Sequence, residues 1–413
     1  SFASFSFNIL GNLNVSAGNF MFTNVITPNT PSITINVTGD ININGGVTQF
    51  QTLPPVSTGG ITTFNVSATN FNLTAGTLTI FASSAGAGST SNINIAGNFT
   101  QSGGTINNCS VGAANGAIST WNIAGNFSQT AGTFTGASSG INPETYLNVF
   151  GNFSQSAGAT ITAGAVFPKL LIEFKGTLNQ NVSVAGNTLL NIWWRLNNAA
   201  GITLATNITI NSLGKFFRTS GAISGAGNIV YVAGSQLKYN GTVNMTSTDK
   251  EWPVTMSGVS VEIDNAGGIN LHASRTVSVS GSEVRLTSGC LYLGNNDLFV
   301  DYVNSGNFAI TSPSPTNMFV TNGTGQFKLS IYVRSGSPAG SDNYTFPIGE
   351  NTGTAEYSPM EIRFYKNTLS RIIGVRVIDA VSPDINTPNT ATDYLSRYWM
   401  VTENGAGGLY RDS

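Results

Sequence analysis

The chain has 413 residues, of which only 17 are Lys or Arg, 19 are Asp or Glu and one is His. Asp40 is the only charged residue before Glu144, whereas about a quarter of the residues in a globular domain are usually charged. The composition excludes a basic stripe for nucleic acid, a multi-histidine metal site and a cysteine zinc cluster. No run of 18 apolar residues is present to span a membrane.

Residues 1–165 contain a repeat. Segments 94–104, 122–132 and 148–158 share the pattern Asn-Ile/Val-Ala/Phe-Gly-Asn-Phe-Ser/Thr-Gln, followed by Ser or Thr, a small residue and Gly. Weaker upstream copies keep one polar residue and a small-Gly or Gly-Gly pair that begins five residues later. The polar column comprises Asn12, Asp40, Asn70, Asn98, Asn126 and Asn152, at steps of 28, 30, 28, 28 and 26 residues. A period of this length is typical of a solenoid, a propeller or a tandem array.

The pattern inside each repeat indicates strands. Residues 33–37 and 41–43 alternate apolar and polar side chains, which is the period of a strand and not the i, i+3, i+4 pattern of a helix. Each copy holds two or three such strands, too few for a four-stranded propeller blade of about 40 residues. We therefore predict an all-β parallel β-helix in which each copy forms one coil and stacking satisfies its open edges.

The polar column is expected to stack at the coil spacing of about 4.8 Å. Its side-chain amides would then donate to one neighbour and accept from the other as a ladder, and Asn also tolerates left-handed backbone angles at turns. The alternative for this column is a polar binding row. One residue later, we predict an inward aromatic stack of Phe71, Phe99, Phe127 and Phe153. A carbohydrate-stacking platform would instead require exposed rings.

Beyond residue 165 the repeat becomes longer and charged. Segments 198–204 and 265–271 share the line Asn-Ala-Ala/Gly-Gly-Ile, so we expect the β-helix to continue with more decorated coils over 166–312. In 313–413, runs such as 360–364 and 373–377 alternate apolar with polar or charged residues, as antiparallel strands with one wet face do. We predict a partial antiparallel β-sandwich there and expect the chain to be a piece of a longer protein.

The repeat resembles a known family. The pattern Gly-Asn-Phe-Ser-Gln-Ser/Thr-Ala-Gly is similar to the repeats of large surface and secreted proteins of Bacteroidota. Segments 174–180 and 265–269 resemble other parts of these repeats, and 346–349 with 357–359 and 397–399 resembles a sandwich module near their C-terminal ends. The resemblance implies export through the type IX secretion system to the outer cell surface or the extracellular space, and a role as an adhesin or surface filament.

Few side chains are candidates for chemistry. Cys109 and Cys290 are expected to be two separate buried thiols, because a disulfide needs Cα atoms within about 7 Å. His272 could act as a general base, but the sequence suggests no nucleophile partner, so a surface or coil-stacking role is favoured. Asp297 and Asp301 could bind calcium weakly but lack the dense oxygen ligands of a specific site.

One pair of carboxylates is close in sequence. Glu262 and Asp264 are expected on one face of a strand and could form a pair like that of a glycosidase. Arg275 and Arg285 favour a salt-bridged, exposed face instead, and such pairs contribute little to stability.

Three functional classes stay open. We predict a non-enzymatic structural or adhesive cell-surface protein, a rigid β-helical shaft for attachment or display, with no catalytic residue, cofactor or metal. The enzymatic alternative is a polysaccharide lyase or hydrolase, but the first 143 residues offer no groups for its groove. The third class is a glycan-binding or ice-binding face, for which 77–79 and 160–162 provide only scattered Thr pairs. Expected partners are surface glycans or other proteins of the cell surface or of secretion, and no nucleic acid.

Overall fold

The computed structural model describes residues 4–23, 32–52, 63–81, 88–109, 117–136, 144–164, 169–189, 192–278, 283–301, 309–310, 312–331, 342–364, 370–383 and 396–404. The chain divides into two compact units, Ser1–Val232 and Ala233–Ser413. All elements of the described ranges are strands, and the fold is a parallel β-solenoid of about ten turns with mixed strands toward its C-terminal end. The predicted fold class is confirmed.

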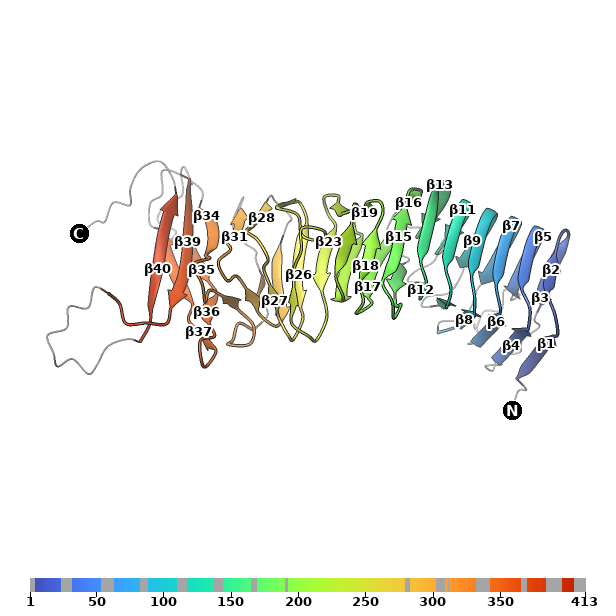
Figure 1. The fold of residues 1–413 in the computed structure, drawn as a ribbon, viewed down its shortest axis with the longest axis horizontal. Helices are drawn as coiled ribbons and strands as arrows, with labels where there is room; N and C mark the ends of the chain where they lie inside the picture. Colours follow the sequence, from blue (N-terminus) through green and yellow to red (C-terminus); the bar gives the residue numbers. More distant parts are fainter. Residues whose placement is uncertain are drawn as a thin grey trace. The chain divides into compact units, whose positions relative to one another are not determined.

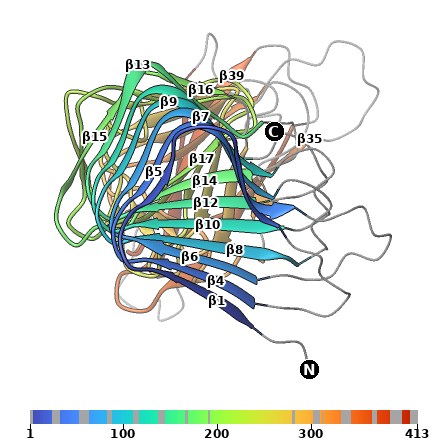
Figure 2. The same ribbon diagram turned by 90° about the vertical axis from the view of Figure 1, so that its right-hand side faces the viewer.

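Unit 1, residues 1–232, is built from two long parallel sheets, to which each coil contributes one strand (Figures 1 and 2). The first sheet contains, in order, β1 (Phe5–Ile9), β4 (Ser32–Val37), β6 (Thr63–Ala68), β8 (Thr90–Ile95), β10 (Ile118–Ile123), β12 (Glu144–Val149), β14 (Lys169–Phe174), β17 (Ile192–Asn197) and β20 (Lys215–Ser220). The second contains β2 (Leu13–Val15), β5 (Ile41–Thr52), β7 (Phe71–Phe81), β9 (Phe99–Cys109), β11 (Phe127–Thr135), β13 (Phe153–Thr162), β15 (Gln180–Val184), β18 (Ile202–Leu204) and β21 (Ile223–Gly225). Smaller pairings add β3 (Asn19–Thr23) to β5, β16 (Asn187–Leu189) to β13, and β19 (Ile208–Ile210) to β22 (Ile229–Tyr231).

The core of unit 1 follows from the two-residue period of these strands. In β4 and β6 alternate residues are buried, and the intervening polar residues are half-buried on the outside. The parallel register then places like with like from coil to coil, as in Ile35↔Val66 and Val66↔Ile93. A column of buried apolar side chains therefore runs through the stack, and each added coil extends the core.

A column of glycines bends the strands of the second sheet. Gly18, Gly46, Gly76, Gly104 and Gly132 all have positive φ, and they are the second member of the small-Gly pair in successive copies. The polar column does not share this backbone, since Leu213 and Ser312 are the only non-glycine residues of the described ranges with positive φ. The expectation that Asn serves there for its left-handed backbone is wrong, because glycine takes that role six residues later.

Unit 2, residues 233–413, also contains parallel sheets and ends in antiparallel strands. Its sheets contain β23 (Gln236–Tyr239), β26 (Ser260–Asp264), β29 (Val284–Ser288) and β32 (Ala309–Ile310); β24 (Met245–Thr246), β27 (Ile269–Asn270), β30 (Leu291–Tyr292), β33 (Phe319–Val320), β36 (Ile348–Glu350) and β37 (Glu356–Tyr357); β25 (Thr255–Ser257), β28 (Arg275–Ser278), β31 (Leu298–Asp301), β34 (Phe327–Ile331), β39 (Arg371–Ile378) and β40 (Tyr398–Asn404); and the pair β35 (Asp342–Phe346) and β38 (Met360–Phe364). The antiparallel pairs are β34–β39, β39–β40, β36–β37 and β35–β38.

The two units divide the chain at a different point from the sequence-based segments 1–165, 166–312 and 313–413. Parallel pairing extends past residue 312, because β34 pairs with β31 and β36 pairs with β33 in parallel register. The sequence-based boundary at 312 rested on a local change of pattern, which does not report whether a strand pairs with the coil before it.

Candidate functional site

The polar column lies at the corner just before the strands of the second sheet. Each side-chain Oδ1 accepts a hydrogen bond from the backbone N–H of the equivalent residue in the next coil, at 2.8 to 3.2 Å. The acceptors are Asn12, Asp40, Asn70, Asn98, Asn126 and Asn152. Only one amide-to-carboxylate bond occurs within the column, from Asn70 Nδ2 to Asp40 Oδ1 at 2.9 Å. The column is therefore a side-chain-to-backbone ladder, in which Asp serves as well as Asn because only an acceptor is needed.

The aromatic column lies one residue further and points inward. The rings of Phe71, Phe99, Phe127 and Phe153 stack with centroid separations of 5.3, 4.7 and 4.7 Å and interplanar angles of 3°, 2° and 5°. Their relative exposure is at most 1%. Trp121 packs edge-on against two of them. Rings placed in this way stabilise the core and leave no face for a carbohydrate.

A second ladder, which was not foreseen, lies in the interior of the coils that contain Phe99, Phe127 and Phe153. Gln101, Gln129 and Gln155 are fully buried, and their side-chain amides bond in series at 3.0 and 3.3 Å. Gln129 Nε2 also donates to the carbonyl of Thr160 at 3.0 Å. The sequence carried a signal for this ladder, because Gln recurs three residues after the polar column. It was missed because Gln usually lies on the surface.

Further amide ladders lie on the outside of unit 1. Asn122 Nδ2 donates to Asn94 Oδ1 at 2.9 Å, and Asn148 Nδ2 donates to Asn122 Oδ1 at 2.8 Å. The row is interrupted where Ser67 takes the register position next to Asn94. The hydroxyl of Ser67 donates to Asn36 at 3.0 Å, and Asn94 Nδ2 has no bonding partner in the described ranges.

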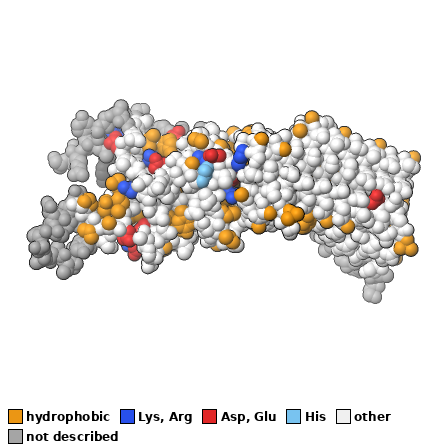
Figure 3. Space-filling model, in the orientation of Figure 1, with side chains coloured by type: hydrophobic (Ala, Val, Ile, Leu, Met, Phe, Trp, Pro, Cys, Tyr) orange, Lys and Arg blue, Asp and Glu red, His pale blue; other side chains and the backbone are white. Residues whose placement is uncertain are grey.

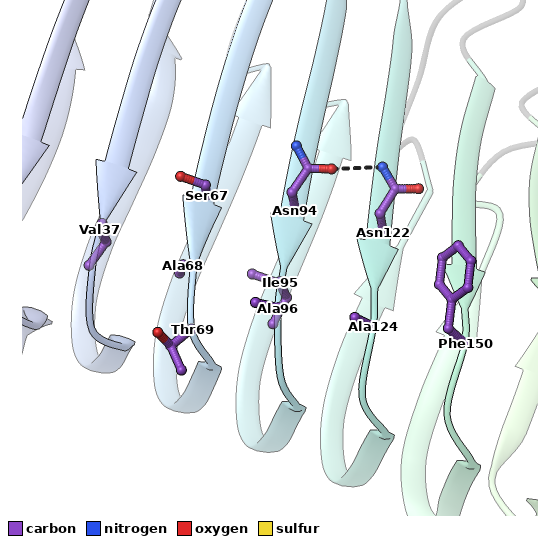
Figure 4. A pocket seen from close by; sticks show the side chains of 10 residues that line it. All are labelled: Val37, Ser67, Ala68, Thr69, Asn94, Ile95, Ala96, Asn122, Ala124 and Phe150. Atoms are coloured by element: carbon purple, nitrogen blue, oxygen red, sulfur yellow. Dashed lines mark hydrogen bonds between the residues drawn. The ribbon is translucent and has the colours of Figure 1, made fainter. Parts of the chain in front are cut away.

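A groove of about 470 Å³ runs beside this row, and its lining comes from the ends of β4, β6, β8, β10 and β12 (Figure 4). Small side chains, Ala96 and Ala124, form its middle, and the ring of Phe150 stands at one end with 40% of the residue exposed. No lining residue is charged. On the face seen in Figure 3, the coils of unit 1 show hardly any charged side chain. This groove is the candidate binding site of unit 1.

Unit 2 brings His272 together with a serine and an aspartate. Ser247 Oγ lies 2.9 Å from Nδ1 of His272, and Asp249 Oδ1 lies 3.0 Å from Nε2. Arg275 donates to Asp249 and also contacts Nε2 of His272. The hydrogen bond from His272 lowers the pKa of Asp249, and Arg275 lowers it further. The sequence suggested no nucleophile partner for His272, and Ser247 reaches it from the preceding coil, 25 residues earlier.

This cluster resembles a catalytic triad in composition but not in access. Ser247 is 1% exposed, and its Oγ also accepts from the backbone N–H of His272 at 3.2 Å. The hydroxyl lies within 3.3 Å of the carbonyl of Asn270 as well. A nucleophile must reach its substrate with a free lone pair, and this hydroxyl is enclosed by the coils that it joins. The cluster therefore links neighbouring coils.

The carboxylates Glu262 and Asp264 lie on one face of β26, and both contact Lys238 of the preceding coil, at 3.0 and 2.8 Å. Glu262 is 8% exposed and also accepts from Thr287 at 2.8 Å. Burial alone would raise the pKa of Glu262, but the hydrogen bonds from Lys238 and Thr287 outweigh it and the pKa is lowered. The exposed face that we expected is wrong for Glu262, and its principal cation is Lys238. Through Lys238 the pair clamps two neighbouring coils together.

The remaining candidates lie apart. Cys109 and Cys290 are both buried free thiols, and burial raises the pKa of Cys109 to about 12. Asp297 bonds Lys328 at 2.6 Å, while Asp301 accepts from the hydroxyl of Ser330 at 2.7 Å. In the described part of the chain, no three His, Cys, Asp or Glu side chains gather in a way that could hold a metal ion.

Comparison with known proteins identifies no family for this chain. No protein-family model, curated protein or solved structure matches the chain. Among the described residues, no helix is long and apolar enough to cross a membrane.

Proposed function

We propose that the protein is a non-enzymatic, structural and adhesive protein of the cell surface, in which the solenoid serves as a rigid shaft for attachment or display. The observation that carries this proposal is the continuity of the ladders in unit 1. The corner column joins successive coils from Asn12 to Asn181, and stacked rings and buried glutamines reinforce it in the coils between Phe71 and Gln155. Hydrogen bonds of this kind run along the stacking direction, so bending or extending the stack must strain several rows at once.

The charge pattern supports a scaffold over an enzyme. General acid–base catalysis requires positioned groups with tuned pKa values. Asp40 is the only charged residue in the coils before Glu144, and it belongs to the corner ladder. The triad-like set in unit 2 has an enclosed hydroxyl, and the pair in β26 is clamped by Lys238. Export to the cell exterior is part of the same proposal and is supported by the resemblance of the repeats.

Two assays on the full chain test this proposal. Beads coated with the protein should adhere to bacterial cell envelopes more strongly than beads coated with serum albumin. The soluble protein should release no reducing ends or unsaturated products from acidic and neutral polysaccharides. Turnover that is abolished by His272→Ala or Glu262→Gln would replace the adhesive assignment with an enzymatic one. Absence of bead adhesion would remove the adhesive part.

A further inference from the structure

We infer that the groove between Thr69 and Phe150 in unit 1 binds an uncharged polysaccharide chain that lies along the stacking direction. This inference rests on the adhesive role proposed above and names the ligand class and the surface that would serve it. Figure 4 shows the groove side chains on successive coils.

The shape of the groove comes from one position of the repeat. The position directly after each strand is occupied by Ala96 after β8, by Ala124 after β10 and by Phe150 after β12. Thr69, which follows β6, flanks the two alanines on the side opposite Phe150. Two methyl side chains between larger neighbours leave a hollow that crosses adjacent coils. From Thr69 to Phe150 there are three coil steps of about 4.8 Å, or about 14 Å. An elongated ligand with a repeat along its length fits such a hollow better than a compact one.

The polar edge of the groove has unused hydrogen-bonding capacity. Asn94 Nδ2 has no partner among the described residues, because Ser67 interrupts the outer amide row. The Ser67 hydroxyl donates its hydrogen bond to Asn36, so its oxygen can accept a hydrogen bond from a ligand. A hydroxyl group both donates and accepts. A ligand hydroxyl can therefore accept from Asn94 and donate to Ser67 at the same time, which restores the row. Sugars present many such hydroxyls.

The apolar and electrostatic character agrees with a neutral sugar. Ligand sites combine aromatic or apolar surface with a few placed polar groups, and here the ring of Phe150 offers a face for the C–H side of a pyranose beside the amides of Asn94 and Asn122. No lining residue is charged. Lys175, in the coil after Phe150, is already paired with Glu173 at 3.9 Å. A polyanion would thus find no free cation in the lining.

The test measures binding of cello-, xylo-, manno- and chito-hexasaccharides to the full chain by calorimetry, with alginate and heparin hexasaccharides as anionic probes. At least one neutral probe should bind, with an affinity that does not change with NaCl because no ion pair is formed. Phe150→Ala should weaken binding about tenfold through loss of the ring face. Ala124→Trp should abolish it by filling the hollow. Leu178→Ala is the matched control, since Leu178 is 78% exposed and lies outside the groove lining.

Three outcomes overturn the inference: no neutral probe binds, only the anionic probes bind, or Phe150→Ala and Ala124→Trp bind as the wild type does. Ala124 and Phe150 are exposed, so both variants should keep the wild-type melting temperature, which is checked by circular dichroism. The bead assay separates this inference from the proposed function. If beads coated with the groove variants adhere like wild type, adhesion does not use the groove; the adhesive role then stands, and the calorimetric result alone decides the groove. If wild-type beads do not adhere although a neutral probe binds in the groove, the adhesive role fails and the binding site stands.

Discussion

Two glycines that the sequence aligns should respond in opposite ways to alanine. Gly132 and Gly158 both end the small-Gly pair of their copies. Gly132 has φ +86°, and a Cβ there would lie 2.5 Å from the carbonyl oxygen of Gly104. Gly158 has no positive φ, and its Cβ would meet only the Thr130 oxygen at 3.5 Å. The cause is a register shift between β11 and β13, which places Gly158 opposite Ala131, a position that already carries a Cβ.

The magnitudes follow from these contacts. Alanine in the left-handed region costs about 1–2 kcal/mol, and relief of the overlap with the neighbouring coil adds about 1–3 kcal/mol. We therefore expect Gly132→Ala to lower the free energy of unfolding by about 2–5 kcal/mol. Gly158→Ala should instead raise it by about 0.4–1 kcal/mol, because alanine restricts the unfolded chain without straining the folded one.

Urea unfolding of the full-length variants, followed by circular dichroism and by hydrogen exchange of β11 and β13, measures both effects. Hydrogen exchange is needed because a solenoid can lose neighbouring coils without global unfolding. If the two variants differ by less than about 0.5 kcal/mol, the register shift between these coils is not a feature of the molecule in solution.

Three further outcomes can be measured on the same protein. Gln129→Leu should cost about 3 kcal/mol, since it removes a buried amide with several bonds, whereas Asn98→Leu, which removes one bond at an exposed residue, should cost about 1 kcal/mol; equal melting temperatures would contradict the assignment of the buried ladder. Cys109 should resist iodoacetamide at about pH 8 until the chain is unfolded, because burial keeps its thiol protonated; rapid labelling, followed by mass spectrometry, would show that the thiol is accessible. Glu262→Gln should destabilise the protein above about pH 5, with the difference from wild type fading as pH falls through the lowered pKa of Glu262, as a pH series of urea melts would show. A deficit that persists at low pH would mean that the loss is steric rather than ionic.

The repeat period made much of unit 1 predictable. Parallel coils place residues about 28 apart in register, so a column in the sequence becomes a column in space, as Phe71↔Phe99 and Phe99↔Phe127 show. Chemical detail was harder to predict. The sequence does not reveal that the donors to Asn98 and its equivalents are backbone amides, because that depends on the path of the chain at the corner.

The features that sequence analysis missed arise where the repeat varies or is absent. Phe150 replaces the alanine of the two copies before it, and that single difference forms one end of the groove. Ser247 meets His272 across two coils that share little sequence similarity, so no period relates them. Glu262 was expected on an exposed face salt-bridged by Arg275 and Arg285, but its partner is Lys238 of β23, in the preceding coil. In each case the contact depends on which coils are neighbours, and the pairing of the strands determines which coils these are.

The two units depend on pH for different physical reasons. Before Glu144 the coils are joined by amides, hydroxyls and aromatic rings, and Asp40 is the only charged residue, so little stability there depends on acid pH. Unit 2 instead joins coils through Glu262 and Asp249, both with lowered pKa values, and through Lys238, whose pKa is raised by its two carboxylates although burial opposes this. Stability from the carboxylates is lost as pH falls through their lowered pKa values, and that from Lys238 is lost as pH rises through its raised pKa. An acidic or saline medium would therefore leave the uncharged coils, and the neutral groove that they carry, almost unchanged. A binding surface whose ligand forms no ion pairs is the kind that such a medium does not weaken.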